Sequence, residues 1–337
     1  GAMEQRGEVP PNWQQSPAYQ DFHRELGVGF YLQGYWAFRA QLAADVAIEE
    51  KQEGDLRLRV VRTPLGVLHE EWRYLPAAYT WAPVRHMVNS VSDLAILRYW
   101  WEHTEYAPDP DEAIRRGPYL QDLGITLCYL PRSHFMQLVA ELAGIGNIVD
   151  FWLLARDEFE ETLRVMESSA DRAAEAALQV PAECFMIPEN LSSEVVGRRF
   201  YEAYVRPYEV KWVRRIRQAG KYAFIHMDGT LRGLMQQVCS AGFDVVEAVT
   251  PHPVGDMPMS EVRAMAQPQT ILWGGLPGTY FTALVSDAEF ERHTREVLEV
   301  MVQDRRMVLG VADQVPPDGL RSRVARVVEL VEKYGRY

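Results

Sequence analysis

The sequence predicts an α/β fold, and the architecture we expect is a closed (β/α)8 TIM barrel. Short, nearly continuous apolar runs alternate with amphipathic segments from residue 124 to the C-terminal end. This alternation is typical of parallel strands joined by crossover helices, and such apolar strands are expected where both faces of the sheet are covered. No Gly-x-Gly-x-x-Gly motif follows a first strand, which argues against a dinucleotide-binding fold. An open doubly wound sheet is the alternative.

Two additions to the barrel are expected near the N-terminal end. Residues 1–20 are polar and rich in Pro and Gln, which indicates a loose N-terminal arm. Residues 45–74 alternate between apolar and polar side chains and contain a turn signal at Glu53 and Gly54. This pattern predicts an early β-hairpin or meander. The rest of the chain, residues 21–337, is expected to form a single barrel domain with the hairpin near its rim.

The elements of the barrel are expected in a regular order. A helix is expected over residues 93–116, which are rich in aromatic side chains. The strands that follow are expected at residues 124–130, 183–190, 222–229, 244–250, 270–276 and 305–313. Helices are expected between them, including residues 134–144, 157–179 and 198–220, and a last helix at 321–335.

Composition excludes several classes of function. The net charge is −12, from 35 basic and 47 acidic residues, which argues against a broad nucleic-acid-binding surface. No apolar run reaches the roughly 18 residues that a membrane span needs. Cys128, Cys184 and Cys239 lack the paired spacing of a disulfide framework or a zinc site, so we expect reduced thiols and a cytoplasmic location.

The candidate functional residues lie where the predicted strands end, because barrel enzymes build their sites at that edge. His226 and Asp228 are two residues apart at the end of one strand, so their side chains should point to the same face. Gly229 follows and allows a sharp turn. The other strand ends contribute Glu189, Glu247, Gly274, Gly275 and Asp313, and His252 lies between two prolines after the strand that carries Glu247.

Two chemical uses of these side chains are open. In the first, Glu189, His226, Asp228 and Asp313 bind zinc or another divalent metal, since carboxylates and imidazole are suitable ligands. In the second there is no metal, and His226, Asp228 and Glu247 act as catalytic acid and base. Gly274, Gly275 and His252 are then candidates for substrate binding, with the glycines allowing close approach of the backbone.

Each candidate also has a purely structural interpretation. His226 would be a hydrogen-bonded core residue, and Asp228 would cap the following helix. Glu247 would form a buried pair with an Arg or Lys. The remaining candidates would serve turns, caps and loops: Glu189 in a capping box with the following Leu-Ser-Ser-Glu, Asp313 at the start of a turn, His252 in a loop, and Gly274 and Gly275 at a strand end.

Several stretches together resemble a known family. They are TPLGVL, RRFYEAYVRPY, HMDGTLRGLMQQVCSAGFDVVEAV, WGGL and LGVADQVPPDG, and the resemblance as a whole covers residues 63–334. In order and spacing the chain resembles the uroporphyrinogen decarboxylase superfamily, which includes zinc-dependent methyltransferases that exchange methyl groups with corrinoid proteins. The resemblance implies a (β/α)8 barrel with a cleft at its C-terminal face, and a homodimer.

The resemblance also shows where this chain departs from the two best-known branches. The methyltransferases hold zinc with a His-x-Cys pair and a further Cys near the last strand. His226 matches that histidine, but Asp228 stands where the first cysteine would be and Asp313 lies near the second. The decarboxylases hold porphyrin carboxylates with an N-terminal arginine-rich stretch, and the corresponding residues 27–40 lack those arginines.

The resulting expectation is a methyltransferase-like enzyme acting on a small methoxylated or aromatic substrate with a corrinoid partner protein. The first alternative is a cofactor-free decarboxylase or lyase, in which Asp228 stabilises positive charge on the substrate and His226 handles the proton. Convergence of Arg73, Arg85 or Arg132 on the cleft would favour this alternative. The second alternative is a non-catalytic barrel that binds a tetrapyrrole, a corrinoid or a partner protein.

Overall fold

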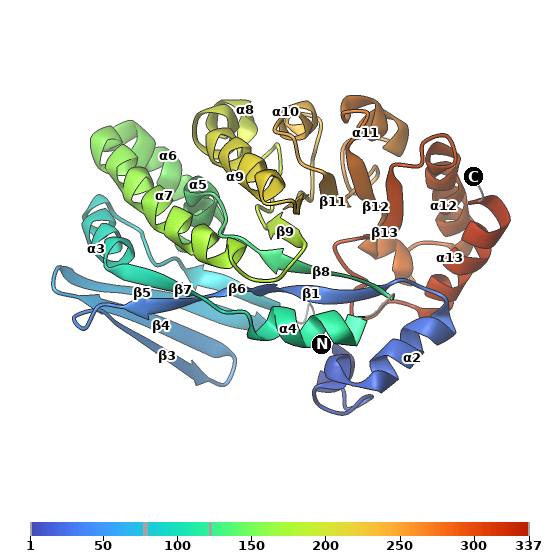
Figure 1. Ribbon diagram of the computed structural model, residues 1–337, viewed down its shortest axis with the longest axis horizontal. Helices are drawn as coiled ribbons and strands as arrows, with labels where there is room; N and C mark the ends of the chain where they lie inside the picture. The colour runs from blue at the N-terminus through green and yellow to red at the C-terminus, as the bar shows by residue number, and fades with distance from the viewer. Residues whose placement is uncertain (1, 77–79, 121–122, 336–337) are drawn as a thin grey trace.

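The computed structural model describes residues 2–76, 80–120 and 123–335, and its centre is a parallel sheet of seven strands. The strand order is β1-β8-β9-β10-β11-β12-β13, and every neighbouring pair is parallel. The sheet curls, and the helices form an arc around its outer side (Figure 1). The strands are β1 (Phe30–Trp36), β8 (Gly124–Tyr129), β9 (Cys184–Ile187), β10 (Tyr222–His226), β11 (Val245–Val249), β12 (Ile271–Pro277) and β13 (Met307–Ala312).

The predicted α/β class with parallel strands is confirmed, whereas a closed eight-stranded barrel is not. In the described part of the chain, β1 and β13 are the two ends of the sheet order. The flanking helices do meet: α2 (Pro17–Leu26) precedes β1 and packs against α13 (Arg321–Tyr334), which follows β13. The Arg321 guanidinium lies 4.6 Å from the Phe22 ring centroid. A Cβ added at Gly27 would lie 3.3 Å from a Val328 methyl group.

The helices follow the predicted alternation. Between β8 and β9 lie α5 (His134–Gln137), the π-helical η2 (Leu138–Leu142), α6 (Gly144–Leu154) and α7 (Arg156–Leu178). Between β9 and β10 lie α8 (Gly197–Phe200), the π-helical η3 (Tyr201–Val205) and α9 (Arg206–Gln218). The remaining helices of the arc are α10 (Met235–Ser240), α11 (Met259–Met265), η4 (Gly278–Phe281) and α12 (Asp287–Met301). None of the helices described is both long and apolar enough to cross a membrane.

The early β-structure is confirmed as a four-stranded antiparallel meander. Its strands are β3 (Ala47–Glu53), β4 (Leu56–Thr63), β5 (Gly66–Leu75) and β6 (Thr80–Arg85). Its exit docks beside the helices that follow β8, because the Val88 N–H donates to the Leu142 carbonyl (2.8 Å). The meander therefore lies toward the carboxyl end of β8.

The helix predicted over residues 93–116 is wrong in its middle. The structure has α3 (Val91–Glu102), then β7 (Thr104–Pro108), then α4 (Asp111–Leu120). β7 pairs antiparallel with β2 (Phe38–Leu42). Two physical reasons account for the break: the prolines at 108 and 110 disfavour a continuous helix, and β2 offers backbone hydrogen bonds to a segment with Thr and Tyr side chains.

The N-terminal segment, expected as a loose arm, contains ordered elements. These are α1 (Ala2–Gln5), the 3-10 turn η1 (Trp13–Gln15) and the start of α2. The Tyr119 hydroxyl donates to the carbonyls of Gln14 (3.0 Å) and Ser16 (2.8 Å). This segment is thus docked on α4, while the division of the chain into an arm of residues 1–20 and a barrel domain stays a prediction.

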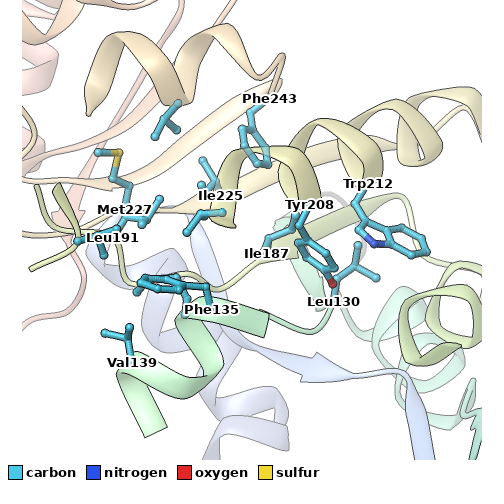
Figure 2. Packing of buried hydrophobic residues seen from close by; sticks show 14 of the residues in the cluster. Leu130, Phe135, Val139, Ile187, Leu191, Tyr208, Trp212, Ile225, Met227 and Phe243 are labelled. Carbon is cyan, nitrogen blue, oxygen red and sulfur yellow. The ribbon is translucent and has the colours of Figure 1, made fainter. Parts of the chain in front are cut away.

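Two apolar clusters lie on opposite faces of the curled sheet. The larger contains Ile187 and Ile225 together with Tyr208 and Trp212 of α9, so it fills the space between strands and helices (Figure 2). The smaller contains Met186, Phe224 and Val245, the neighbours that alternate with those residues along the strands. Because side chains alternate across a strand, this second cluster marks the inner face of the curl.

Candidate active site at the carboxyl edge of the sheet

His226 and Glu247 form a pair on the inner face. Each lies two residues beyond a member of the inner apolar cluster, Phe224 on β10 and Val245 on β11. The two residues are in register between the neighbouring strands. The His226 Nδ1 lies 2.6 Å from Glu247 Oε2, and the side chains are 12% and 7% exposed. Strand parity and register together therefore build an imidazole–carboxylate pair at the edge of the sheet.

The charges around this pair favour the protonated imidazole. Burial lowers the pKa of His226, but the hydrogen bond and charge of Glu247 outweigh this effect. Asp228 and Asp313 act in the same direction as Glu247, and the pKa of His226 ends above its usual value. Such a balance suits a proton donor that is held by a carboxylate.

Asp228 lies close to this pair and is not engaged as a helix cap. Burial raises the pKa of its carboxyl, which the charge of His226 opposes. Asp313 adds to the rise, and the Arg132 guanidinium acts against it. The capping interpretation of Asp228 does not hold, because Asp256 accepts the nearby N–H groups of Leu231 (2.8 Å) and Arg232. Asp228 therefore remains a candidate for the chemistry of the site.

Residues with strained backbone conformations lie at the same edge of the sheet. Four non-glycine residues in the described ranges have positive φ, and three of them lie at carboxyl ends of parallel strands. These are Asn190 (φ 55°) after β9, Ala248 (φ 63°) in β11 and Asp313 (φ 68°) after β13. The register of β11 against β12 shifts between Val246 and Val249, which is a bulge next to Glu247. Strained backbone of this kind is typical of functional sites.

Glu189 does not join the inner group. Glu189 follows the turn at Pro188 after β9, and its fully buried carboxyl acts on Tyr208 and Glu209 of α9, so it lies on the side of the helices. Its two carboxylate oxygens accept the Ser133 N–H (2.8 Å) and the Ser133 hydroxyl (3.0 Å). Burial raises the pKa of Glu189 to about 7, although the Ser133 bonds and the Arg132 charge oppose this rise.

The proposed metal ligands therefore do not converge. Among residues 2–76, 80–120 and 123–335, no group of three or more His, Cys, Asp or Glu side chains is placed to hold a metal ion. Glu189 is bound to Ser133 and does not join His226, Asp228 and Asp313. Cys128, Cys184 and Cys239 are buried free thiols on other parts of the fold. The arrangement does not fit a zinc or other divalent metal site, and we derive no step through one.

The residues predicted to bind substrate, Gly274, Gly275 and His252, have contacts other than with the His226–Glu247 pair. A Cβ added at Gly274 (φ 142°) would lie 2.5 Å from the Val249 carbonyl oxygen, so the close approach of β11 requires glycine there. The Gly275 carbonyl faces His293 Nε2 at 3.1 Å. His252 is exposed and lines a cleft of about 660 Å³ between α11 and α12, together with His293. That cleft is not lined by His226 or Asp228.

Sequence reasoning named Arg132 as one of three candidate arginines, but it missed Ser133 in the same turn after β8. Arg132 donates to Asn190 Oδ1 (3.0 Å) and forms an ion pair with Glu141. The position of both residues just after the apolar run 124–130 is the signal that could have identified the turn. Of the three arginines considered, Arg132 reaches this edge, whereas Arg73 pairs with Asp55 in the meander (3.9 Å). Arg85 is exposed at the end of β6.

Comparison with known proteins agrees with this geometry at the level of the family. The family model described as uroporphyrinogen decarboxylase (URO-D) matches residues 131–334. The chain belongs to the URO-D family. Among solved structures, a methyltransferase from Methanosarcina mazei superposes with a TM-score of 0.58 and 11% sequence identity, covering 99% of this chain and 90% of that one. At this identity the likeness shows the fold alone. No curated protein matches.

Proposed function

We propose that this URO-D family chain is an enzyme in which His226 and Glu247 act as an acid–base pair on a small molecule bound at the inner face of the sheet. The observation that carries the proposal is the 2.6 Å contact between His226 Nδ1 and Glu247 Oε2. Because Nδ1 is bound to Glu247, the proton that reaches a substrate leaves from Nε2. The carboxylate holds the ring in place and stabilises its charged form.

The reaction that this arrangement supports best is decarboxylation of a small carboxylated molecule without a cofactor. When the bond between the substrate carbon and its carboxylate breaks, CO2 leaves and the electron pair stays on the carbon. The His226 imidazolium supplies the proton that this carbon takes up. On a substrate ring that takes up a proton before this bond breaks and releases it after the carbon is protonated, Asp228 stabilises the transient positive charge of the ring, as a buried carboxylate close to the reacting group can do.

Methyl transfer is the second candidate, supported by the fold likeness to the Methanosarcina methyltransferase. In this reaction His226 protonates the oxygen that departs from a methoxylated aromatic substrate, and the methyl group passes to the cobalt of a corrinoid partner protein. The corrinoid partner, the homodimer and the cytoplasmic location expected from the sequence stay predictions in either case, as does a complete (β/α)8 barrel.

The two reactions are separated by one assay on the purified protein. Panels of carboxylated and methoxylated aromatic molecules are incubated with and without EDTA and with reduced cobalamin, and CO2 and methylcobalamin are measured. CO2 release that survives EDTA supports decarboxylation, whereas methylcobalamin formation supports the second candidate. His226→Gln should lower either activity about 10²- to 10⁴-fold, as expected for loss of a general acid.

A matched histidine provides the control for this assay. His103 lies in the turn between α3 and β7 and contacts the Tyr99 carbonyl (2.8 Å), so His103→Gln should keep full activity. An activity that His226→Gln leaves intact would overturn both candidates. Tight binding of a tetrapyrrole with no turnover of any panel member would instead support a non-catalytic binding protein.

A further inference from the structure

Glu189 has no role in the proposed acid–base chemistry, yet it forms hydrogen bonds with Ser133. It is fully buried behind the sheet, and both of its oxygens are occupied by Ser133. A carboxylate in such a place costs free energy unless its hydrogen bonds are strong and well aimed. Because both oxygens of Glu189 accept hydrogen bonds from a single residue, its contacts indicate a structural task at Ser133.

The turn that Glu189 holds is fixed from several sides. Residues 131–133 link β8 to α5, and the Ser133 hydroxyl also accepts the Met136 N–H (3.3 Å) at the start of that helix. The Tyr208 hydroxyl donates to the Pro131 carbonyl (3.0 Å). Glu189 binds the backbone N–H and the side chain of the same residue, so it sets both the position and the orientation of this turn.

The residue in the middle of that turn is Arg132. Its guanidinium donates to Asn190 Oδ1 (3.0 Å), and Asn190 directly follows Glu189 with a positive φ of 55°. Two successive residues after β9 thus form hydrogen bonds with two successive residues after β8. The Arg132 side chain is only 15% exposed, and its charge acts on Asp228 across the edge of the sheet.

We propose that Glu189 is a positioning residue, which holds the turn at Ser133 so that the Arg132 guanidinium stays bound to Asn190 at the carboxyl edge of the sheet, where the site lies. The inference rests on the proposed function, because it makes Arg132 the cation that meets an anionic substrate. Arg132 itself is bound by Asn190 and Glu141, and Glu189 adds the hold on the backbone of the next residue.

The test needs no substrate, because it measures how well Arg132 is held. The protein is treated with phenylglyoxal, and the modification of each arginine is followed by peptide mass spectrometry. Glu189→Ala should speed modification of Arg132 about 10- to 100-fold, the change expected when a hydrogen bond to a charged group is lost. Glu189→Gln, which keeps one acceptor oxygen, should give a smaller increase.

Two internal controls separate positioning from general loosening. Arg98 is also partly buried, at 19% exposure, and pairs with Glu158, so its rate should not change. Glu209→Gln alters a second fully buried carboxyl close to Glu189, which accepts the Tyr201 hydroxyl (2.6 Å), and should leave Arg132 protected. Ser133→Ala should add nothing in the Glu189→Ala background. An unchanged Arg132 rate in Glu189→Ala, or an equal increase at Arg98, overturns the proposal.

A second readout connects the positioning residue to catalysis. In the CO2 assay, Glu189→Gln should raise KM as Arg132→Gln does, while the pH midpoint of kcat, which His226 sets, stays the same. A shifted midpoint with an unchanged KM contradicts the proposal. Loss of Arg132 protection is measured independently of turnover, so a failure of the proposed reaction and a failure of the positioning role give different results.

Discussion

Glu247 and Glu189 occupy comparable places at the ends of parallel strands and have opposite roles. Glu247 shares the parity of Val245, points to the inner face and holds His226. Glu189 follows the turn after β9, lies toward α9 and holds Ser133. The two carboxylates show that the side of the strand, more than the residue type, decides whether a strand-end acid meets a substrate or fixes the scaffold.

The largest expected difference between these residues is in stability. Glu189→Ala leaves two buried donors of Ser133 without an acceptor and should lower the free energy of unfolding by about 4 kcal/mol. Glu247→Ala leaves one partner, His226, which is less deeply enclosed, and should cost about 1–2 kcal/mol. Urea unfolding of both variants measures the difference. Equal losses would remove the distinction between the two faces.

The pH dependence of stability should sharpen the same distinction. The pKa of Glu189 rises from 4.5 to about 7 on folding, so the folded protein binds the extra proton between these values. The corresponding stability is complete below pH 4.5 and is lost as the pH rises through 7. Glu189→Gln should remove a decline on the order of 3 kcal/mol across this range. Thermal melts from pH 5 to 8.5 measure it, and an unchanged decline in the variant would contradict this account.

Gly274, next to the bulge in β11, allows a test of how closely β11 and β12 approach each other. Gly274→Ala would place a methyl group against the Val249 carbonyl at a positive φ and should cost about 2–3 kcal/mol. Gly146 in α6 has open space around it, so Gly146→Ala should stabilise by about 0.5–1 kcal/mol. Chemical denaturation compares the two. A tolerated Gly274→Ala would mean that β11 and β12 separate readily at this edge.

The smallest expected effect is on the imidazole itself. Glu247→Gln removes the charge that raises the pKa of His226, so that pKa should fall. Two-dimensional NMR of the histidine ring signals follows the change, and Glu189→Gln serves as the comparison on the opposite face. A pKa of His226 that responds more strongly to Glu189 than to Glu247 would reverse the assignment of the two carboxylates.

The sequence predicted the alternation of strands and helices well, because periodicity and burial determine it directly. That His226 and Asp228 share a face stays a prediction, because β10 ends at His226. The sequence did not place Glu189, because the chain turns at Pro188 after β9 and strand alternation no longer applies there. The structural alternative for Glu247 was a pair with an Arg or Lys, and only the register of β10 against β11 identifies His226 as its partner.

The residues that sequence reasoning missed depend on contacts between distant segments. Ser133 binds Glu189, and Arg132, which was only one of three candidate arginines, binds Asn190. Both partners lie in a different loop. The replacement of Asp228 by Asp256 as the acceptor for the turn at Leu231 is likewise a tertiary contact. Local patterns carry no information about such pairings, whereas strand ends are marked clearly in the sequence.

The packing of α2 against α13 has a consequence for how the chain folds. Contacts such as that between Gly27 and Val328 join the first and the last parts of the molecule, so nearly the whole chain must be ordered before they form. They should appear late in refolding and be lost early under mechanical load applied to the two ends. The packing of α2 against α13 thus joins the two ends of the fold, although β1 and β13 are not neighbours in the described sheet.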